Sequence, residues 1–256
     1  MIKRKYTCIP DQCRCEKLPM AYYHVGKSVE KIPNSKHINV LYWKTHNQES
    51  ESSCTGYALS TLREHYEIIK GNIVDLSPLF IYWWERKMID SVFEDGGARI
   101  GDGMEVLKDL GVCEEKYHKS IPGTSKDVFV KPDTKAMVSA LSYRISEYTS
   151  VPNLDQLLIA LASSNPVVIG IPIYKSIESH SVNKTGIIPT PKRKEELLGG
   201  HAVVACGYDK KKKMVRFHNS WGIKWGDGGY GYAPFDYLKA SSVSTGFWGG
   251  WEIKSV

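Results

Sequence analysis

The chain has 256 residues, of which 42% are hydrophobic, so it can bury the core of one large domain or of two small ones. This composition excludes a disordered or fibrous protein. The formal net charge of +6 is modest, and the basic residues are spread along the chain except in the run Lys210–Lys213. That run is typical of a solvated hairpin tip, so we expect no nucleic-acid partner.

The sequence contains no stretch that approaches the roughly 18 apolar residues of a membrane span. Its basic first residues are not followed by the apolar region of a standard signal peptide. We therefore expect no membrane partner and favour a cytoplasmic location, with secretion by another route left open. A monomer is favoured, although the sequence does not fix the oligomeric state.

The first 45 residues show no sustained hydrophobic period and contain three prolines, which predicts an extended segment laid over the surface. Cys8, Cys13 and Cys15 cluster in this segment. They could bind a metal, but no matching pair of Cys or His follows at the spacing of a zinc site. A disulfide or free thiols fit better, so we predict no metal site and no cofactor.

The next hundred residues are predicted to be helical. Apolar residues at helical spacing begin at Cys54 and stop before Gly71, which indicates a long helix. Ser77, followed directly by a proline, is the expected N-cap of a second helix. Asp102 is the expected cap of a third, shorter helix. We expect this helical lobe to span residues 46–142.

The last hundred residues read mainly as strands, apart from a short helix after Pro132 and another capped by Asn153. Strands are predicted at residues 143–151, 167–174, 202–208, 214–217 and 246–253. The third and fourth of these flank a charged turn and form a hairpin. The chain is thus α-then-β, with an extension at residues 1–45, a helical lobe at 46–142 and a β-rich lobe at 143–256.

The hairpin carries polar residues suited to catalysis at the outer ends of its two strands. His201 opens the first strand and Asn219 closes the second, so folding brings both to one edge of the sheet. An imidazole beside a side-chain amide is an oriented general base that needs a nucleophile. Cys54 is the candidate, because the N-terminus of a helix and a neighbouring imidazolium both favour the reactive thiolate.

Three further groups would complete such a site. Trp221 lies two residues after Asn219 and can shield the hydrogen bond between Asn219 and His201 from water. A tetrahedral intermediate also needs donors for its oxyanion. The backbone N–H of Cys54 is one donor, and the side-chain amide of Gln48, just upstream, is the other.

Gln48 precedes Cys54 by six positions, and the blocks G-H-A-V-V-A-C-G-Y and N-S-W-G-I-K-W-G-D-G-G-Y-G follow later. From about residue 40 to the end, this pattern resembles the papain family of cysteine peptidases. The resemblance implies Cys54 as nucleophile, His201 as general acid and base, Asn219 as orienting residue and Gln48 as oxyanion donor. The separation of Cys54 from His201 fits the ~130 to 150 residues typical of that family.

The resemblance implies an α+β, two-lobe papain-like fold. It has an N-terminal helical lobe, a C-terminal lobe like an antiparallel β-barrel, and the active-site cleft between them. Thr55 replaces the usual aromatic residue, and Glu51 stands where many members have a disulfide cysteine, which points to a compact bacterial or archaeal type of member. Residues 1–45 are the candidate for an intramolecular covering segment.

Substrate contacts are expected at glycines. Gly96 and Gly97 resemble the family's glycine pair, whose backbone groups pair with an extended peptide, although an ordinary loop explains them as well. Gly200 could offer its carbonyl to the substrate. His218 should point away from the site because a strand alternates its faces, and the other histidines read as surface or structural residues.

The predicted activity is that of a cysteine peptidase that hydrolyses peptide bonds through a thioester acyl-enzyme. Its partner would be a peptide or protein substrate. A transpeptidase or amidating enzyme could use the same thioester. A non-catalytic peptide-binding member of the fold is the remaining alternative.

Overall fold

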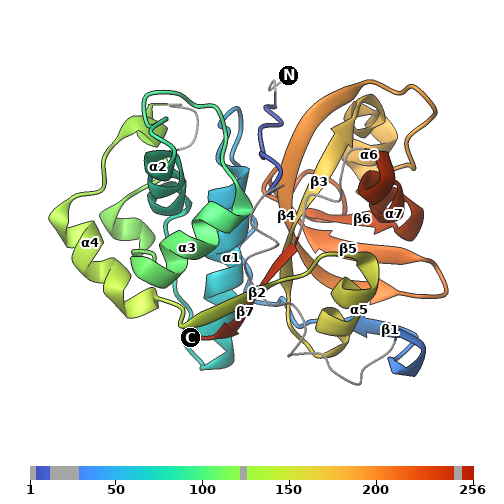
Figure 1. The fold of residues 1–256 in the computed structure, drawn as a ribbon, viewed down its shortest axis with the longest axis horizontal. Helices are drawn as coiled ribbons and strands as arrows, with labels where there is room; N and C mark the ends of the chain where they lie inside the picture. The colour runs from blue at the N-terminus through green and yellow to red at the C-terminus, as the bar shows by residue number, and fades with distance from the viewer. Residues whose placement is uncertain (1–3, 12–28, 122–125, 245–249) are drawn as a thin grey trace.

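The computed structural model describes residues 4–11, 29–121, 126–244 and 250–256, the side chains of residues 240–244 excepted. It has a helical lobe and a β-rich lobe, and residues 4–11 lie between them (Figure 1). Within the described ranges, no helix is both long enough and apolar enough to cross a membrane.

The helical lobe contains the helices α1 Cys54–Ile69, α2 Pro78–Met88, α3 Ile100–Asp109 and α4 Thr134–Ala140. The side chain of Ser77 accepts a hydrogen bond from the Phe80 N–H, which confirms it as the N-cap of α2. The prediction that Asp102 caps α3 was wrong, because α3 begins two residues earlier. The Gly101 N–H in its first turn instead binds the carboxylate of Asp11, at 3.1 and 3.2 Å from its two oxygens.

The β-rich lobe is built on one antiparallel sheet. Its strands are β1 Ser35–His37, β2 Glu147–Ser150, β3 Val167–Tyr174, β4 Leu197–Asp209, β5 Met214–His218, β6 Tyr230–Pro234 and β7 Gly250–Ser255. Neighbouring strands follow the order β2-β7-β3-β4-β5-β6, and β1 also pairs with β4. The sheet is not closed into a barrel. The helices of this lobe are α5 Leu154–Ala162, α6 His180–Thr185 and α7 Phe235–Ser244.

Several strands differ in extent from their predictions. β4 begins at Leu197, before the predicted start, because Gly199 and Gly200 already pair with β3. His201 therefore lies within the strand and not at its first residue. β2 is shorter than predicted, since Leu141–Tyr143 form a 3-10 turn. The closing strand is present from Gly250, and residues 246–249 lie outside the described part of the chain.

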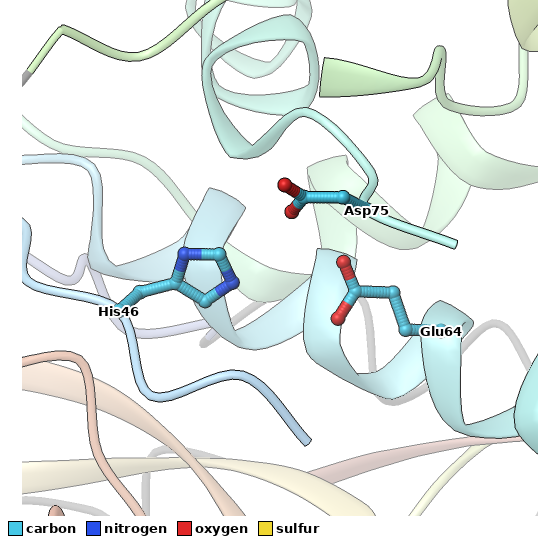
Figure 2. A group of neighbouring side chains, drawn as sticks. All are labelled: His46, Glu64 and Asp75. Atoms are coloured by element: carbon cyan, nitrogen blue, oxygen red, sulfur yellow. The ribbon is translucent and has the colours of Figure 1, made fainter. Parts of the chain in front are cut away.

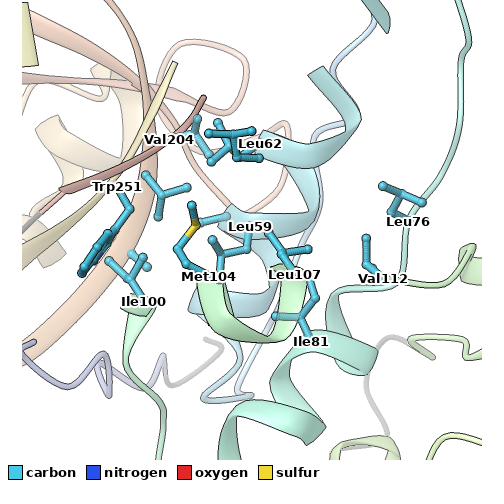
Figure 3. Packing of buried hydrophobic residues seen from close by; sticks show 14 of the residues in the cluster. Leu59, Leu62, Leu76, Ile81, Ile100, Met104, Leu107, Val112, Val204 and Trp251 are labelled. Atoms are coloured by element: carbon cyan, nitrogen blue, oxygen red, sulfur yellow. The ribbon is translucent and has the colours of Figure 1, made fainter. Parts of the chain in front are cut away.

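Strand β4 joins the cores of the two lobes. Ala202 and Val204 contact the cluster that contains Leu59 and Leu62 of α1, whereas Val203 belongs to the cluster on the other face of the sheet. This alternation follows from the two-residue period of a strand. Figure 3 shows Val204 and Leu62 side by side at this junction. The shared core fixes the helix that carries Cys54 against the strand that carries His201.

The N-terminal segment differs from its prediction in two ways. Residues 4–11 run between the lobes and not over the outer surface (Figure 1). Further along, Ser35–His37 form β1, which adds to the sheet beside β4. Part of the predicted extension is therefore integral to the β-rich lobe.

Candidate active site

Cys54, His201 and Asn219 meet at the junction of the lobes. Cys54 is the first residue of α1, His201 lies on β4, and Asn219 directly follows β5. His201 Nε2 lies 2.8 Å from Asn219 Oδ1. The imidazole is near enough to the Cys54 sulfur to lower the pKa of that thiol. All three side chains are buried. This is the arrangement of an activated thiol with an oriented base.

The surroundings of the Cys54 sulfur favour its charged form. The interaction with the Cys8 thiol is the largest influence that holds the pKa of Cys54 well below its usual range. Burial opposes this effect, while the His201 imidazole and the Ala202 N–H add to it. These surroundings favour the thiolate over the thiol.

Trp221 covers the imidazole of His201. The two rings stack with 4.5 Å between centroids and 24° between planes, and Trp221 is only 6% exposed. Trp225 packs edge-on against Trp221 at 5.0 Å. The indole thus covers one face of the His201 ring. Its shielding of the hydrogen bond between His201 and Asn219 from water stays a prediction.

Replacing Trp221 by alanine is expected to lower kcat/KM on a peptide about tenfold, which is part of the 10²–10⁴-fold that a positioned acid–base group contributes. Water would then compete for the hydrogen bond between His201 and Asn219. The matched control is Trp84→Ala, the same change on α2 away from the site. Steady-state kinetics that fall equally in both variants would show that Trp221 contributes only packing.

Gln48 is fixed next to Glu51 and Ser220 by three hydrogen bonds. Its Nε2 donates to the Glu51 carbonyl at 2.8 Å, its Oε1 accepts from Ser220 Oγ at 2.6 Å, and its backbone N–H donates to the Ser220 carbonyl at 2.9 Å. A primary amide has two N–H donors, so one remains for a ligand. Sequence analysis missed Ser220. Its position next to Asn219 was the one available signal, because Gln48 lies 172 positions away.

The sequence lacks the family's aromatic residue at Thr55 and its disulfide cysteine at Glu51. Polar contacts are formed at both positions. Thr55 Oγ1 donates a hydrogen bond to Glu85 Oε2 at 2.6 Å, and both residues are fully buried. Glu51 Oε2 accepts a hydrogen bond from Ser53 Oγ at 3.0 Å. Burial raises the pKa of Glu51 to about 7. The loop before α1 is thus held by hydrogen bonds among the described residues around it.

Residues 4–11, here called the covering segment, occupy the cleft as an extended chain. The Cys8 N–H donates to the Gly200 carbonyl at 3.0 Å, and the Gly200 N–H donates to the Tyr6 carbonyl at 3.2 Å. On the opposite wall, the Ile9 N–H donates to the Ala98 carbonyl at 2.9 Å. The backbone of the segment therefore bridges both lobes.

The predicted substrate glycines differ in their surroundings. Gly97 has a φ of +90°, and a Cβ built on it would lie 1.8 Å from the Thr7 carbonyl oxygen. Only glycine allows so close an approach. A Cβ on Gly96 would meet nothing within 4 Å. Gly97 and Gly200 thus line the cleft and contact the covering segment.

Side chains at both ends anchor the covering segment. The Arg4 guanidinium lies 4.6 Å from the centre of the Trp221 ring, and the Tyr6 ring meets the same indole edge-on at 6.0 Å. At the other end, the buried Asp11 carboxylate accepts from the Gly101 N–H and from Trp251 Nε1. Burial raises the pKa of Asp11 to about 6.

A second polar cluster lies outside the cleft. His46, Glu64 and Asp75 bring potential ligand atoms within 4.8 Å of one another (Figure 2). Glu64 Oε1 accepts the Leu76 N–H at 2.8 Å, and Asp75 pairs with Lys44 at 2.6 Å. Burial lowers the pKa of His46 to about 4 and raises that of Glu64 to about 8. His46 Nε2 and Asp75 Oδ1 are buried and have no hydrogen-bond partner among the described residues.

The comparisons with known proteins agree with this geometry. A family model described as "Papain family cysteine protease" matches residues 35–237. An uncharacterised peptidase C1-like protein of Acanthamoeba polyphaga mimivirus is 33% identical over 79% of this chain and 68% of its own length. Cysteine proteinase 3 of Entamoeba histolytica is 25% identical over 83% of this chain and 66% of its own.

Solved structures show the same fold. Xylellain, a cysteine protease from Xylella fastidiosa, is 30% identical and superposes with a TM-score of 0.85 over 100% of this chain and 99% of its own. The ragweed pollen cysteine protease Amb a 11, in its proform, is 19% identical with a TM-score of 0.71 over 93% of this chain and 71% of its own. The second likeness concerns the fold alone.

Proposed function

Since the chain belongs to the papain family of cysteine proteases, we propose that it hydrolyses peptide bonds with Cys54 as the nucleophile. His201 is the general acid and base, and Asn219 orients its imidazole. The oxyanion donors are the backbone N–H of Cys54 and the free amide N–H of Gln48. The observation that carries this proposal is the 2.8 Å contact between His201 Nε2 and Asn219 Oδ1 beside the buried Cys54, the first residue of α1.

Each step of the proposed reaction uses one of these groups. The Cys54 thiolate attacks the scissile carbonyl, and the oxyanion forms toward the two N–H donors. His201 then gives its proton to the leaving amine, which leaves a thioester on Cys54. Water next attacks the thioester with His201 as base. This second attack releases the acid product and restores the thiolate.

Extended peptide would bind along the walls of the cleft. The Gly200 carbonyl and the backbone around Gly97 and Ala98 are the groups that now hold the covering segment. A peptide substrate needs the same backbone groups. The covering segment therefore competes with substrate, and the proform of Amb a 11 shows that a relative in fold has a precursor form.

A panel of fluorogenic peptides tests the proposal. We expect the wild-type protein, with residues 1–9 removed to open the cleft, to cleave at least one member, and the same protein with Cys54→Ala to cleave none. Cys206→Ala is the matched control, because Cys206 is a buried cysteine outside the site. Added amines in the assay distinguish the alternatives. If amide products replaced acid products, the enzyme would be a transferase and not a hydrolase.

A further inference from the structure

Cys8 has no role in the proposed mechanism, yet the covering segment places it directly on the nucleophile. Its backbone is fixed by the hydrogen bonds of Cys8 N–H to Gly200 and of Ile9 N–H to Ala98. Its side chain is 4% exposed and lies in the same buried cluster as Cys54, which is 0% exposed. The neighbouring Thr7 Oγ1 donates to the Ser52 carbonyl at 3.4 Å, two residues before Cys54. The two thiols are close enough to shift each other's pKa.

We propose that Cys8 and Cys54 are a redox pair, and that a disulfide between them fastens the covering segment across the cleft. The inference rests on the proposed role of Cys54 as nucleophile, because the bond would block that sulfur. Both residues are free thiols in this structure, which represents the reduced and covered state. In that state the segment is held by non-covalent contacts alone.

The two sulfurs differ in their readiness to react. The interaction with Cys54, followed by burial, raises the pKa of Cys8 well above its usual range, while the pKa of Cys54 is held well below its usual range. The thiolate is the form that peroxide oxidises. Cys54 is therefore the sulfur oxidised first, and Cys8 is the resolving thiol held beside it.

The chemistry balances with a peroxide as oxidant and a dithiol as reductant. When the segment lifts, the Cys54 thiolate attacks hydrogen peroxide, which gives a sulfenic acid and releases hydroxide. Return of the segment brings the Cys8 thiol to that sulfur. An S–S bond forms as the S–O bond breaks, and water leaves. A dithiol later reduces the disulfide to two thiols and becomes a cyclic disulfide itself.

The disulfide between Cys8 and Cys54 would block the enzyme and would also protect Cys54 from further oxidation. A sulfenic acid without a resolving thiol oxidises further to sulfinic acid, which dithiols do not reduce. The disulfide stops this progression. It also raises the local concentration of the segment at the cleft, because the segment can no longer leave. Reducing conditions would then be required for activity.

Mass spectrometry tests the bond without any activity assay. The full-length protein is treated with equimolar hydrogen peroxide, its remaining thiols are blocked with iodoacetamide, and it is digested with trypsin. Cleavage after Lys5 and Arg14 gives the peptide Tyr6–Arg14, which contains Cys8 and Cys13, and cleavage after Lys44 and Arg63 gives Thr45–Arg63 with Cys54. We expect these two peptides to be cross-linked. The link should form in the Cys13→Ser/Cys15→Ser variant and be lost in Cys8→Ser.

Activity supplies the second readout. After peroxide treatment, dithiothreitol should restore at least about tenfold more activity in the Cys13→Ser/Cys15→Ser variant than in Cys8→Ser, whose Cys54 oxidises irreversibly. Absence of the cross-link in the double variant, or its survival in Cys8→Ser, would overturn the inference. A cross-link in a protein that cleaves no peptide would leave the redox pair standing and refute the proposed function.

Discussion

Replacing His201 by alanine should lower kcat/KM for peptide hydrolysis at least about a thousandfold, since it removes both the proton acceptor of Cys54 and the acid that protonates the leaving amine. The imidazole is fully buried, stacks on Trp221 and contacts both Cys54 and Asn219. The reaction of Cys54 with iodoacetamide at pH 6 should slow as well, because the thiolate loses the imidazolium beside it.

The measurement is steady-state kinetics on a fluorogenic peptide, with thermal unfolding as a check that the variant is folded. His37→Ala is the matched control, because His37 is exposed on β1 and lies outside the cleft. We expect the control to retain wild-type kinetics. A His201→Ala protein that is folded and keeps more than a tenth of the activity would show that another base serves Cys54.

Removing residues 1–9 should raise kcat/KM at least about tenfold, because substrate binds only the fraction of molecules whose cleft is open. The deletion removes the hydrogen bonds of the segment with Gly200 and Ala98 and the contacts of Arg4 and Tyr6 with Trp221. It keeps Asp11, which binds the Gly101 N–H and Trp251 and so supports the fold of the helical lobe. A longer deletion through residue 35 would begin to remove β1.

A point variant weakens the binding of the covering segment without shortening the chain. Lys5→Ala breaks the ion pair of Lys5 with Asp95, which measures 2.7 Å and is half-exposed at Lys5, so we expect only a small rise in kcat/KM. Equal kinetics in the full chain and in the deletion variant, both measured with dithiothreitol present, would mean that the segment does not compete with substrate.

The sequence predicted the parts of the structure that depend on local signals. The caps of α2 and α5 were found because Ser77 and Asn153 accept hydrogen bonds from N–H groups three residues later. Asp102 misled the prediction for a physical reason. The Gly101 N–H in the first turn of α3 is bound by Asp11, a residue of the covering segment 90 positions away that no local pattern reveals.

At the site, too, local sequence signals predicted some features, while features that depend on distant contacts were missed. Spacing and residue type pointed to Cys54, His201, Asn219 and Gln48, which the structure brings together. The path of residues 4–11 could not be predicted, because it depends on backbone hydrogen bonds with Gly200 and Ala98 and on the room that Gly97 leaves. The three cysteines near the N-terminus looked alike in the sequence. Only the fold distinguishes Cys8, while Cys13 and Cys15 lie outside the described residues.

Trapping the acyl-enzyme tests the proposed mechanism most directly. The protein without residues 1–9 is mixed with a peptide ester, quenched in acid within the first turnover, digested and analysed by mass spectrometry. We predict an acyl group on the peptide Thr45–Arg63, whose one cysteine is Cys54, and none after prior alkylation of Cys54. Product formation without an acyl group on this peptide, or with the group on another residue, would contradict catalysis by a Cys54 thioester.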